Sequence, residues 1–294
     1  MEQPLPRGVG LTALSVADAR ARESARLDRL FDDPFAQLFV DAAGAEFAPP
    51  STANAIDIRA ARAEYVAIRT RFFDDELRAA CAAGCRQVVV LAAGLDTRAF
   101  RLEWPVGAPL FELDVAEVLA FKERVLADHC ATPTCERRVV VADLREDWPT
   151  TLRAAGFAPA QPTAWLAEGI LMYLAEPERD ALLDAIGACS APASRLALEP
   201  PVWQVSAAMS EKIARGVVDR AELARVAAEV MPQVPPPPDP SIADPRAWLV
   251  RHGWQAHIYD VAERFHAYGR ATPMMFSPAA ANMPARRLAT ATRL

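Results

Sequence analysis

Between residues 87 and 200 the chain alternates short apolar runs with stretches of helical periodicity, and this alternation constrains the fold more than any other feature. The run Val88-Val89-Val90-Leu91 is apolar at every position, which is typical of a strand buried on both faces of a parallel sheet. Five strands are expected here, at 87–91, 109–114, 137–142, 163–167 and 194–199. Strands separated by helices of about 10–15 residues predict a doubly wound α/β sheet, with ligands at the carboxyl ends of its strands.

Helical segments are expected on both sides of this core. Residues 10–48 indicate two helices that break at Asp33-Pro34, with Thr12 or Ser15 as a cap of the first. A long helix is expected over 53–83, closed by Gly84. Within and beyond the core we expect helices at 115–129, 147–155, 176–189 and 245–252, a helical cap at 201–240, and strands at 254–259 and 287–292.

The composition argues against several classes of protein. A net charge of −6 does not suit a protein that grips phosphate backbones. The chain has no apolar run of about 18 residues or more, and its first residues lack the features of a secretion signal. The five cysteines show neither CxxC spacing nor paired histidines nearby, so reduced thiols are expected rather than a zinc site. We therefore expect a cytoplasmic monomer or homodimer without a nucleic-acid or membrane partner.

The first strand runs into a turn that contains a single glycine, Gly94. Glycine at this place lets the backbone approach a ligand that a side chain would block. The three-glycine fingerprint of a nicotinamide site is missing, which argues against a nicotinamide-dependent oxidoreductase. Three interpretations of the turn stay open: a phosphate-binding turn, a plain strand–helix turn, and a site for an adenosine cofactor that has no pyrophosphate.

Acidic residues follow three successive strands. Asp114 ends the second strand, 20 residues after Gly94, where it can accept hydrogen bonds from both ribose hydroxyls of an adenosine. Asp143 ends the third strand, where the acid or its backbone can reach the adenine amino group while Leu144 packs on the ring. Glu168 ends the fourth strand. Each acid alone could be a helix N-cap, but together they favour an adenosine site.

Other charged residues near the turn have plainer interpretations. Asp96 and Arg98 can simply pair with each other at the start of the helix that follows. Arg69 and Arg71 lie on the long helix before the first strand, where arginines are usually solvated. An arginine that reached the carboxyl ends of the strands could instead bind a ligand carboxylate with two N–H groups of its guanidinium.

These residues resemble the bacterial branch of the leucine carboxyl methyltransferase family. The resemblance runs from about residue 11 to 200, and the string Gly94-Leu95-Asp96-Thr97-Arg98 is specific. That string is part of a longer match over 93–102, and the other matching strings lie at 17–23, 30–36, 68–75, 111–114 with Lys122, 143–145 and 167–174. Beyond residue 200 the resemblance is weak, and we expect substrate choice to lie there.

The resemblance implies methyl transfer from S-adenosylmethionine to oxygen, often of a carboxylate, and bacterial members include polyketide-tailoring enzymes. By motif, Arg69 would hold the methionine carboxylate and Glu168 would face the methionine amino group. Gly94 would approach the methionine part, Asp114 would bind the ribose, and Asp143 and Leu144 would bind the adenine. The family commonly has glycine where Ala92 stands, so the turn is more crowded here.

The function expected is therefore O-methylation of a small-molecule carboxylate in natural-product tailoring. A phenolic acceptor is the alternative, and a non-catalytic cofactor-binding homologue is the alternative of another class. A carboxylate is ionised at pH 7 and needs no general base, whereas a phenol would benefit from one. Tyr173 is expected to orient the acceptor, His266 is the one plausible base among the histidines, and Arg264 or Arg270 could bind an acceptor carboxylate.

The predicted organisation has four parts. Residues 1–84 form an N-terminal helical region that packs on the core and covers the cofactor, and 85–200 form the Rossmann-like core. Residues 201–240 form the cap, and 241–294 complete the core.

Overall fold

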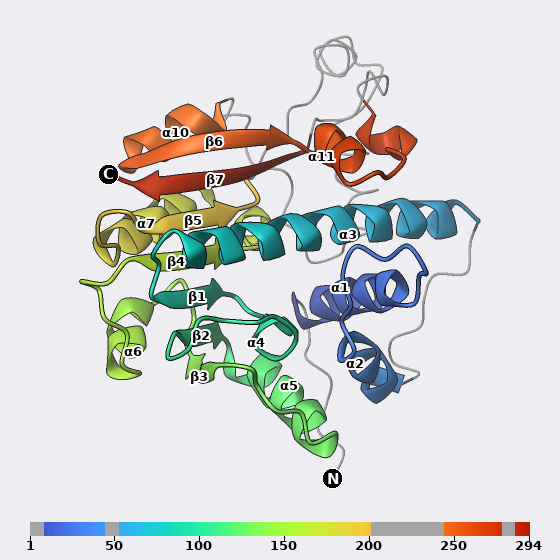
Figure 1. Ribbon diagram of the computed structural model, residues 1–294, viewed down its shortest axis with the longest axis horizontal. Coiled ribbons are helices and arrows are strands. Elements are labelled where there is room, and N and C mark those ends of the chain that lie inside the picture. Colours follow the sequence, from blue (N-terminus) through green and yellow to red (C-terminus); the bar gives the residue numbers. More distant parts are fainter. Residues whose placement is uncertain (1–8, 45–52, 201–243, 278–285) are drawn as a thin grey trace. The chain divides into compact units, whose positions relative to one another are not determined.

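The computed structural model describes residues 9–44, 53–200, 244–277 and 286–294 (Figure 1). The chain divides into two compact units, one made of 1–166 with 189–195 and the other of 167–188 with 196–294. The cap predicted at 201–240 lies outside the described residues. In the part that is described, no helix is long and apolar enough to cross a membrane.

The first unit holds three helices before its first strand and then alternates strands with helices. Its elements are α1 (Val9–Ser24), α2 (Ala36–Ala43), α3 (Ala53–Ala82), β1 (Gln87–Leu91), α4 (Arg98–Arg101), β2 (Pro109–Asp114), α5 (Ala116–Asp128), β3 (Glu136–Val141), α6 (Trp148–Ala154) and β4 (Thr163–Ala167), whose last residue belongs to the second unit.

The second unit continues the alternation and ends in a pair of strands. Its elements are the short helix η2 (Leu171–Tyr173), α7 (Glu176–Ala188), β5 (Arg195–Leu198), whose first residue belongs to the first unit, α10 (Pro245–Arg251), β6 (Trp254–Asp260), α11 (Val261–Ala267), η3 (Met274–Phe276) and β7 (Arg287–Arg293). Figure 1 shows β6 and β7 side by side.

Hydrogen bonds order the strands as β3-β2-β1-β4-β5-β7-β6. β1 runs parallel to β2 and β2 parallel to β3, whereas β7 is antiparallel to β6. Each predicted strand agrees with an observed one to within one residue at either end. The α/β prediction is confirmed, and the antiparallel last strand makes the sheet mixed.

Complete burial explains why the central strands read as uninterrupted apolar runs. Every residue of β1 and of β4 is buried. The two polar exceptions are Gln87 and Thr163, the first residues of β1 and β4, and the Gln87 amide nitrogen donates to the Ala158 carbonyl at 2.7 Å and to the Thr163 hydroxyl at 2.9 Å. Because a buried amide without partners is costly, these bonds hold the start of β1 beside β4.

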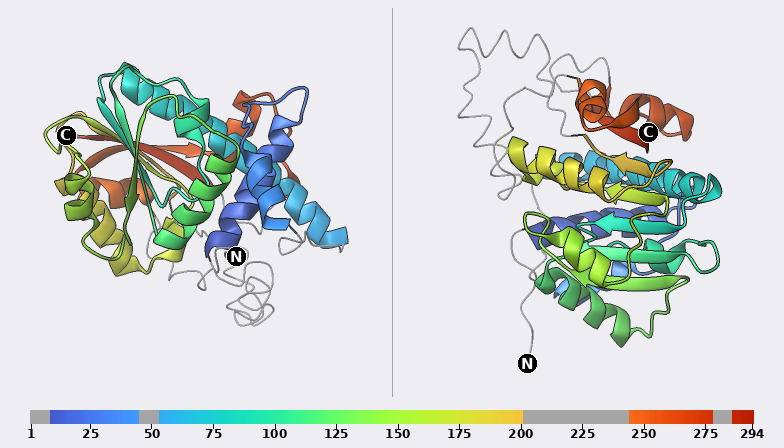
Figure 2. Two further views of the ribbon diagram at one scale, coloured as in Figure 1. Left: turned by 90° about the horizontal axis from the view of Figure 1, so that it is seen from below. Right: turned by 90° about the vertical axis from the view of Figure 1, so that its left-hand side faces the viewer.

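The N-terminal helices pack on one another within the first unit. α1 packs against the N-terminal half of α3 (Figures 1 and 2), and an ion pair of 2.7 Å between Asp18 and Arg59 joins them. α1 begins at Val9, so Thr12 and Ser15 lie inside it and the prediction that one of them caps it is wrong. The predicted break is confirmed, because the Asp33 carboxylate accepts from the backbone N–H groups that lead into α2.

Candidate cofactor site

The turn after β1 has an unusual backbone. Ala92 (φ +48°) and Gly94 (φ +51°) both adopt the left-handed conformation. For a residue with a Cβ this conformation costs roughly 1–2 kcal/mol, whereas glycine adopts it freely. A Cβ built on Gly94 would lie 3.5 Å from Cβ of Ala13 in α1. The turn therefore presents bare backbone at Gly94, next to the first helix.

Asp114 fastens this turn to the end of β2. Its Oδ2 accepts the Gly94 N–H at 2.6 Å and its Oδ1 accepts the Val115 N–H at 2.7 Å. A carboxylate has roughly four lone-pair sites, so two remain for the hydroxyls of a ligand. Burial raises the pKa of Asp114, and the two N–H donors oppose that rise. The structure thus brings together two of the residues that the sequence singled out, Gly94 and Asp114.

Asp143 follows β3 and is half-buried, as is Leu144 beside it. The Asp143 carboxylate pairs with Arg145 through Nε at 3.0 Å and Nη2 at 2.6 Å. Hydrogen bonding to Arg145 lowers the pKa of Asp143, so the acid is held ionised. The sequence reasoning did not foresee this pairing, although the two residues are only two positions apart.

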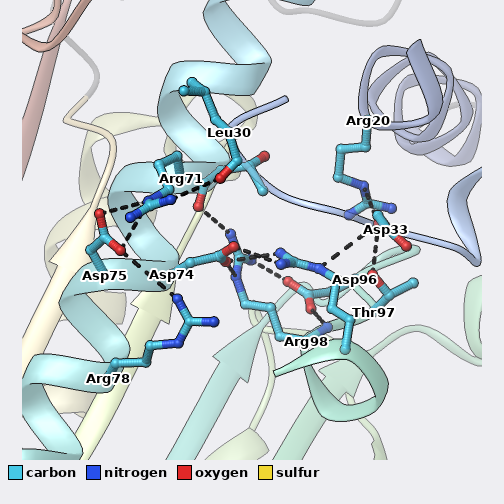
Figure 3. A network of polar contacts seen from close by, with 12 residues as sticks. Arg20, Leu30, Asp33, Arg71, Asp74, Asp75, Arg78, Asp96, Thr97 and Arg98 are labelled. Carbon is cyan, nitrogen blue, oxygen red and sulfur yellow. Dashed lines mark hydrogen bonds and ion pairs between the residues drawn. The ribbon is translucent and has the colours of Figure 1, made fainter. Parts of the chain in front are cut away.

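The two arginines of α3 differ in their surroundings. Arg69 is only 7% exposed, and its guanidinium lies 5.6 Å from the centre of the Tyr65 ring. The solvated interpretation is therefore wrong for Arg69, which is buried in the first unit. Arg71 is half-buried, pairs with Asp75 at 2.9 Å and donates to the Leu30 carbonyl at 2.8 Å (Figure 3).

A buried network of six charges surrounds the string that follows Gly94 (Figure 3). Its members balance in charge, and no side chain among them is more than 8% exposed. They are Arg20, Asp33, Asp74, Asp96, Arg98 and Arg101. Removing one partner of a buried ion pair typically costs about 3–5 kcal/mol because the other charge is left buried without its partner, so each member of the network depends on the others.

Asp74 of α3 links the network to the string. It accepts from Arg98 Nε at 2.7 Å and from Arg101 Nη1 at 2.6 Å. Burial alone would raise the pKa of Asp74, but Arg101 and Arg98 hold that pKa below its usual range. Likewise burial alone would raise the pKa of Asp96, but Arg98 and, with smaller effects, the other nearby cations together lower it to about 2. The pairing of Asp96 with Arg98 is confirmed, and it is one part of a larger structure.

The network explains four of the strings on which the family resemblance rests. The strings at 17–23, 30–36, 68–75 and 93–102 each contribute at least one of its charges. Sequence reasoning gave most of these residues no role, because their partners lie far away along the chain.

In the second unit, Glu168 and Tyr173 are both half-buried, just after β4 and in η2 respectively. Arg179 of α7 was missed by the sequence reasoning. It is 2% exposed, and its Nε donates to the carbonyls of Leu171 at 2.9 Å and Leu174 at 2.8 Å, which bracket Tyr173. The signal was present, because Arg179 occupies the first position of a buried face continued by Leu182, Leu183 and Ile186.

The histidines and the arginines of α11 have varied surroundings. His129 contacts the Val125 carbonyl at the end of α5, and His252 lies between Asp184 and Asp180 at 2.7 and 3.2 Å. His266 is exposed on α11, whereas Arg264 stacks on the Tyr259 ring at 5.2 Å. Arg270 is buried.

All five cysteines are free thiols, and burial raises the pKa of Cys81 and of Cys135 to about 11. At neutral pH both therefore remain protonated and poorly nucleophilic. Within the described ranges, no three metal-ligating side chains gather in a way that could hold an ion.

Comparison with known proteins identifies the family. The model of the leucine carboxyl methyltransferase family matches residues 13–187. The chain belongs to the leucine carboxyl methyltransferase family. The matched range contains every proposed cofactor residue and Tyr173, whereas His266 lies beyond it.

Two relatives of this family member share most of its length. A protein of Parafrankia sp. (strain EAN1pec) is 48% identical over 256 residues, which cover 86% of this chain and 79% of the relative. A protein of Mycobacteroides abscessus is 44% identical and covers 89% of each chain. Both are named "Putative S-adenosyl-L-methionine-dependent methyltransferase".

Solved structures support the fold of this family member. A DUF574 family protein from Streptomyces avermitilis superposes with a TM-score of 0.52 at 15% identity, covering 96% of this chain and 97% of its own. A "putative methyltransferase" from Thermobifida fusca gives a TM-score of 0.51 at 19% identity, covering 95% and 94%. The seven-stranded mixed sheet is thus the sheet of the class I methyltransferase fold.

Proposed function

We propose that this protein transfers the methyl group of S-adenosyl-L-methionine to a carboxylate oxygen of a small molecule and so forms a methyl ester. The cofactor follows from the family and from the names of the two relatives. The observation that supports the site best is the turn at Gly94, where bare backbone lies beside a carboxylate with lone pairs to spare.

The residues present fit this cofactor. Asp114 can accept both ribose hydroxyls while it keeps its bonds to Gly94 and Val115. Arg69 offers a buried guanidinium for the methionine carboxylate, to which a planar fork is well matched. Asp143 with Leu144 would hold the adenine, and by resemblance Glu168 would face the methionine amino group.

The reaction is an in-line displacement in which a carbon–oxygen bond forms while the carbon–sulfur bond breaks. When bound, the cofactor supplies a methyl group on a positively charged sulfur, which is a strong electrophile. A carboxylate acceptor carries the matching negative charge, so a neutral ester and S-adenosylhomocysteine result without proton transfer. The protein therefore has to orient the acceptor and exclude water rather than supply a base.

Tyr173 is the residue we assign to orient the acceptor, since its turn is held by a buried arginine. Arg264 or Arg270 would balance the acceptor's charge. A phenolic acceptor would need a general base, for which His266 is the candidate. We place the enzyme in the tailoring of bacterial natural products such as polyketides, on the strength of its resemblance to such enzymes.

Cofactor binding tests the site. Titration calorimetry with S-adenosylmethionine and S-adenosylhomocysteine should show binding tighter than about millimolar. Asp114→Asn should weaken S-adenosylhomocysteine binding at least about tenfold, because the amide donates toward the ribose instead of accepting from it. Asp128→Asn is the matched control, since Asp128 is exposed at the end of α5 in the same unit. Absence of binding, or an unchanged affinity in Asp114→Asn, would contradict the site.

The acceptor class is tested separately. The protein is incubated with S-adenosylmethionine and panels of carboxylic acids and phenols, and products that gain one CH2 group are found by mass spectrometry. A methyl ester reverts to the acid in mild alkali, whereas an aryl methyl ether survives. Alkali-stable products would favour the phenolic alternative. Binding without any product would favour the non-catalytic homologue.

A further inference from the structure

We propose that Arg20 of α1 is a positioning residue for the cofactor, because it sets the backbone of the turn at Gly94. The inference rests on the proposed cofactor site at that turn. It gives a role to the string at 17–23, to which neither the sequence nor the proposed reaction assigns one.

Arg20 acts on the residue immediately after Gly94. Its Nη2 donates to the Leu95 carbonyl at 2.5 Å. Its Nε lies 3.1 Å from Oδ2 of Asp33, as Figure 3 shows. The same Asp33 oxygen accepts from the Thr97 hydroxyl at 2.7 Å. Groups on both sides of Asp96 are therefore held by residues of the N-terminal region.

These bonds fix Gly94 between two anchored peptide groups. The Gly94 N–H is bonded to Asp114 at 2.6 Å on one side, and the Leu95 carbonyl is bonded to Arg20 on the other. Glycine has the freest backbone of any residue, so the shape of the turn depends on such anchors. The bond from Arg20 to the Leu95 carbonyl has a charged donor, and such bonds are stronger than neutral ones. Leu95 is only 3% exposed, so this bond is shielded from water.

α1 also touches the turn directly. Cβ of Ala13 lies within 3.5 Å of the position that a Cβ on Gly94 would occupy. Ala13 and Arg20 are seven residues apart, close to two turns, and so lie on the same face of α1. The same face of α1 therefore contacts the turn at Gly94 and donates the hydrogen bond to the Leu95 carbonyl. Docking of α1 and binding of the cofactor should therefore strengthen each other, since coupling between sites is reciprocal.

A purely structural role of Arg20 predicts something different, namely that cofactor affinity falls only as much as overall stability does. Asp18 supplies the matched control. It lies on the same helix and joins α1 to α3 through Arg59 at 2.7 Å, and it also pairs with Arg22 of its own helix. Asp18→Asn should loosen α1 without changing the Leu95 carbonyl.

The experiment compares Arg20→Lys, Thr97→Val and Asp18→Asn in the full chain. Lysine keeps a charge near Asp33 but lacks the fork that reaches both Asp33 and Leu95. We expect Arg20→Lys to weaken S-adenosylhomocysteine binding about tenfold by calorimetry, and Thr97→Val about threefold. Asp18→Asn should lower the melting temperature yet leave the affinity within about twofold.

Hydrogen exchange supplies a second readout. S-adenosylhomocysteine should slow exchange of the α1 amides in the unsubstituted protein and in Asp18→Asn, and much less in Arg20→Lys. The proposal is overturned if affinity follows melting temperature equally in all three variants, or if Arg20→Lys and Thr97→Val bind normally. If Arg20→Lys does not fold, Thr97→Val decides by itself. If the unsubstituted protein binds no cofactor, the proposed function fails first.

Discussion

At the scale of single residues, Ala92 is one of three non-glycine residues with a positive φ in the part of the chain that the structure describes. Alanine in the left-handed conformation is strained, whereas glycine there is not. We expect Ala92→Gly to raise the free energy of unfolding by about 1 kcal/mol, as measured by urea denaturation. Ala93→Gly is the control, because Ala93 has no positive φ and should lose stability. A loss of stability in Ala92→Gly would contradict the strain.

Asp96 should make stability depend on pH in acid. Its pKa of about 2 in the folded protein lies below the value of 3.8 expected when it is unfolded. A lowered folded pKa gives stability that is fully present above pH 4 and is lost as the pH falls toward 2. The loss should amount to about 2 kcal/mol in unfolding experiments between these values.

The control for this pH dependence is a pair of variants. Asp96→Asn should be less stable at neutral pH and should show a shallower loss between pH 4 and 2, because its titrating group is gone. Glu103→Gln, at an exposed acid in the same unit, should keep the original slope. An unchanged slope in Asp96→Asn would show that other acids dominate.

At the scale of elements, α7 holds η2 through Arg179. Burial lowers the pKa of Arg179, so the cation is kept there at a cost that its two carbonyl partners offset. Arg179→Met fills a similar volume but leaves both carbonyls without this donor. We expect a loss of about 1–2 kcal/mol in unfolding free energy and faster hydrogen exchange at residues 171–175.

Arg179→Lys separates charge from geometry in this test. Lysine keeps the charge but is a single point donor, so it should protect the turn only in part. If hydrogen exchange at residues 171–175 is the same in the unsubstituted protein, Arg179→Met and Arg179→Lys, the turn is stable without Arg179.

The elements themselves were largely predictable because their signals are local. β1 and β4 are apolar at each central position, and the adjacent residues Asp33 and Pro34 predicted the break before α2. The predicted cap of α1 was wrong because Thr12 and Ser15, although residue types that often cap helices, lie inside a helix that begins at Val9. The reversal of β7 was also not foreseen, since a strand pattern does not specify direction.

At the scale of the whole molecule, the candidate site was predicted where a rule of topology applied, and missed where long-range pairing decided. The closeness of Asp114 to the turn at Gly94 was predictable because the end of β2 lies beside the end of β1 in such a sheet. The bonds from Arg98 to Asp74 and from Arg20 to Leu95 span 24 and 75 positions. No local pattern identifies partners at that distance.

The balanced network of three arginines and three aspartates also limits how this fold can be rebuilt. Grafted alone into another sheet, the segment 94–102 would bring buried charges without their counter-charges, and the recipient would bear the cost of the mismatch. A chimera should therefore succeed when its boundary keeps α1, the Asp33 loop, α3 and the turn from a single parent. Protein engineers who exchange the part of the chain after residue 200 can leave these N-terminal segments unchanged.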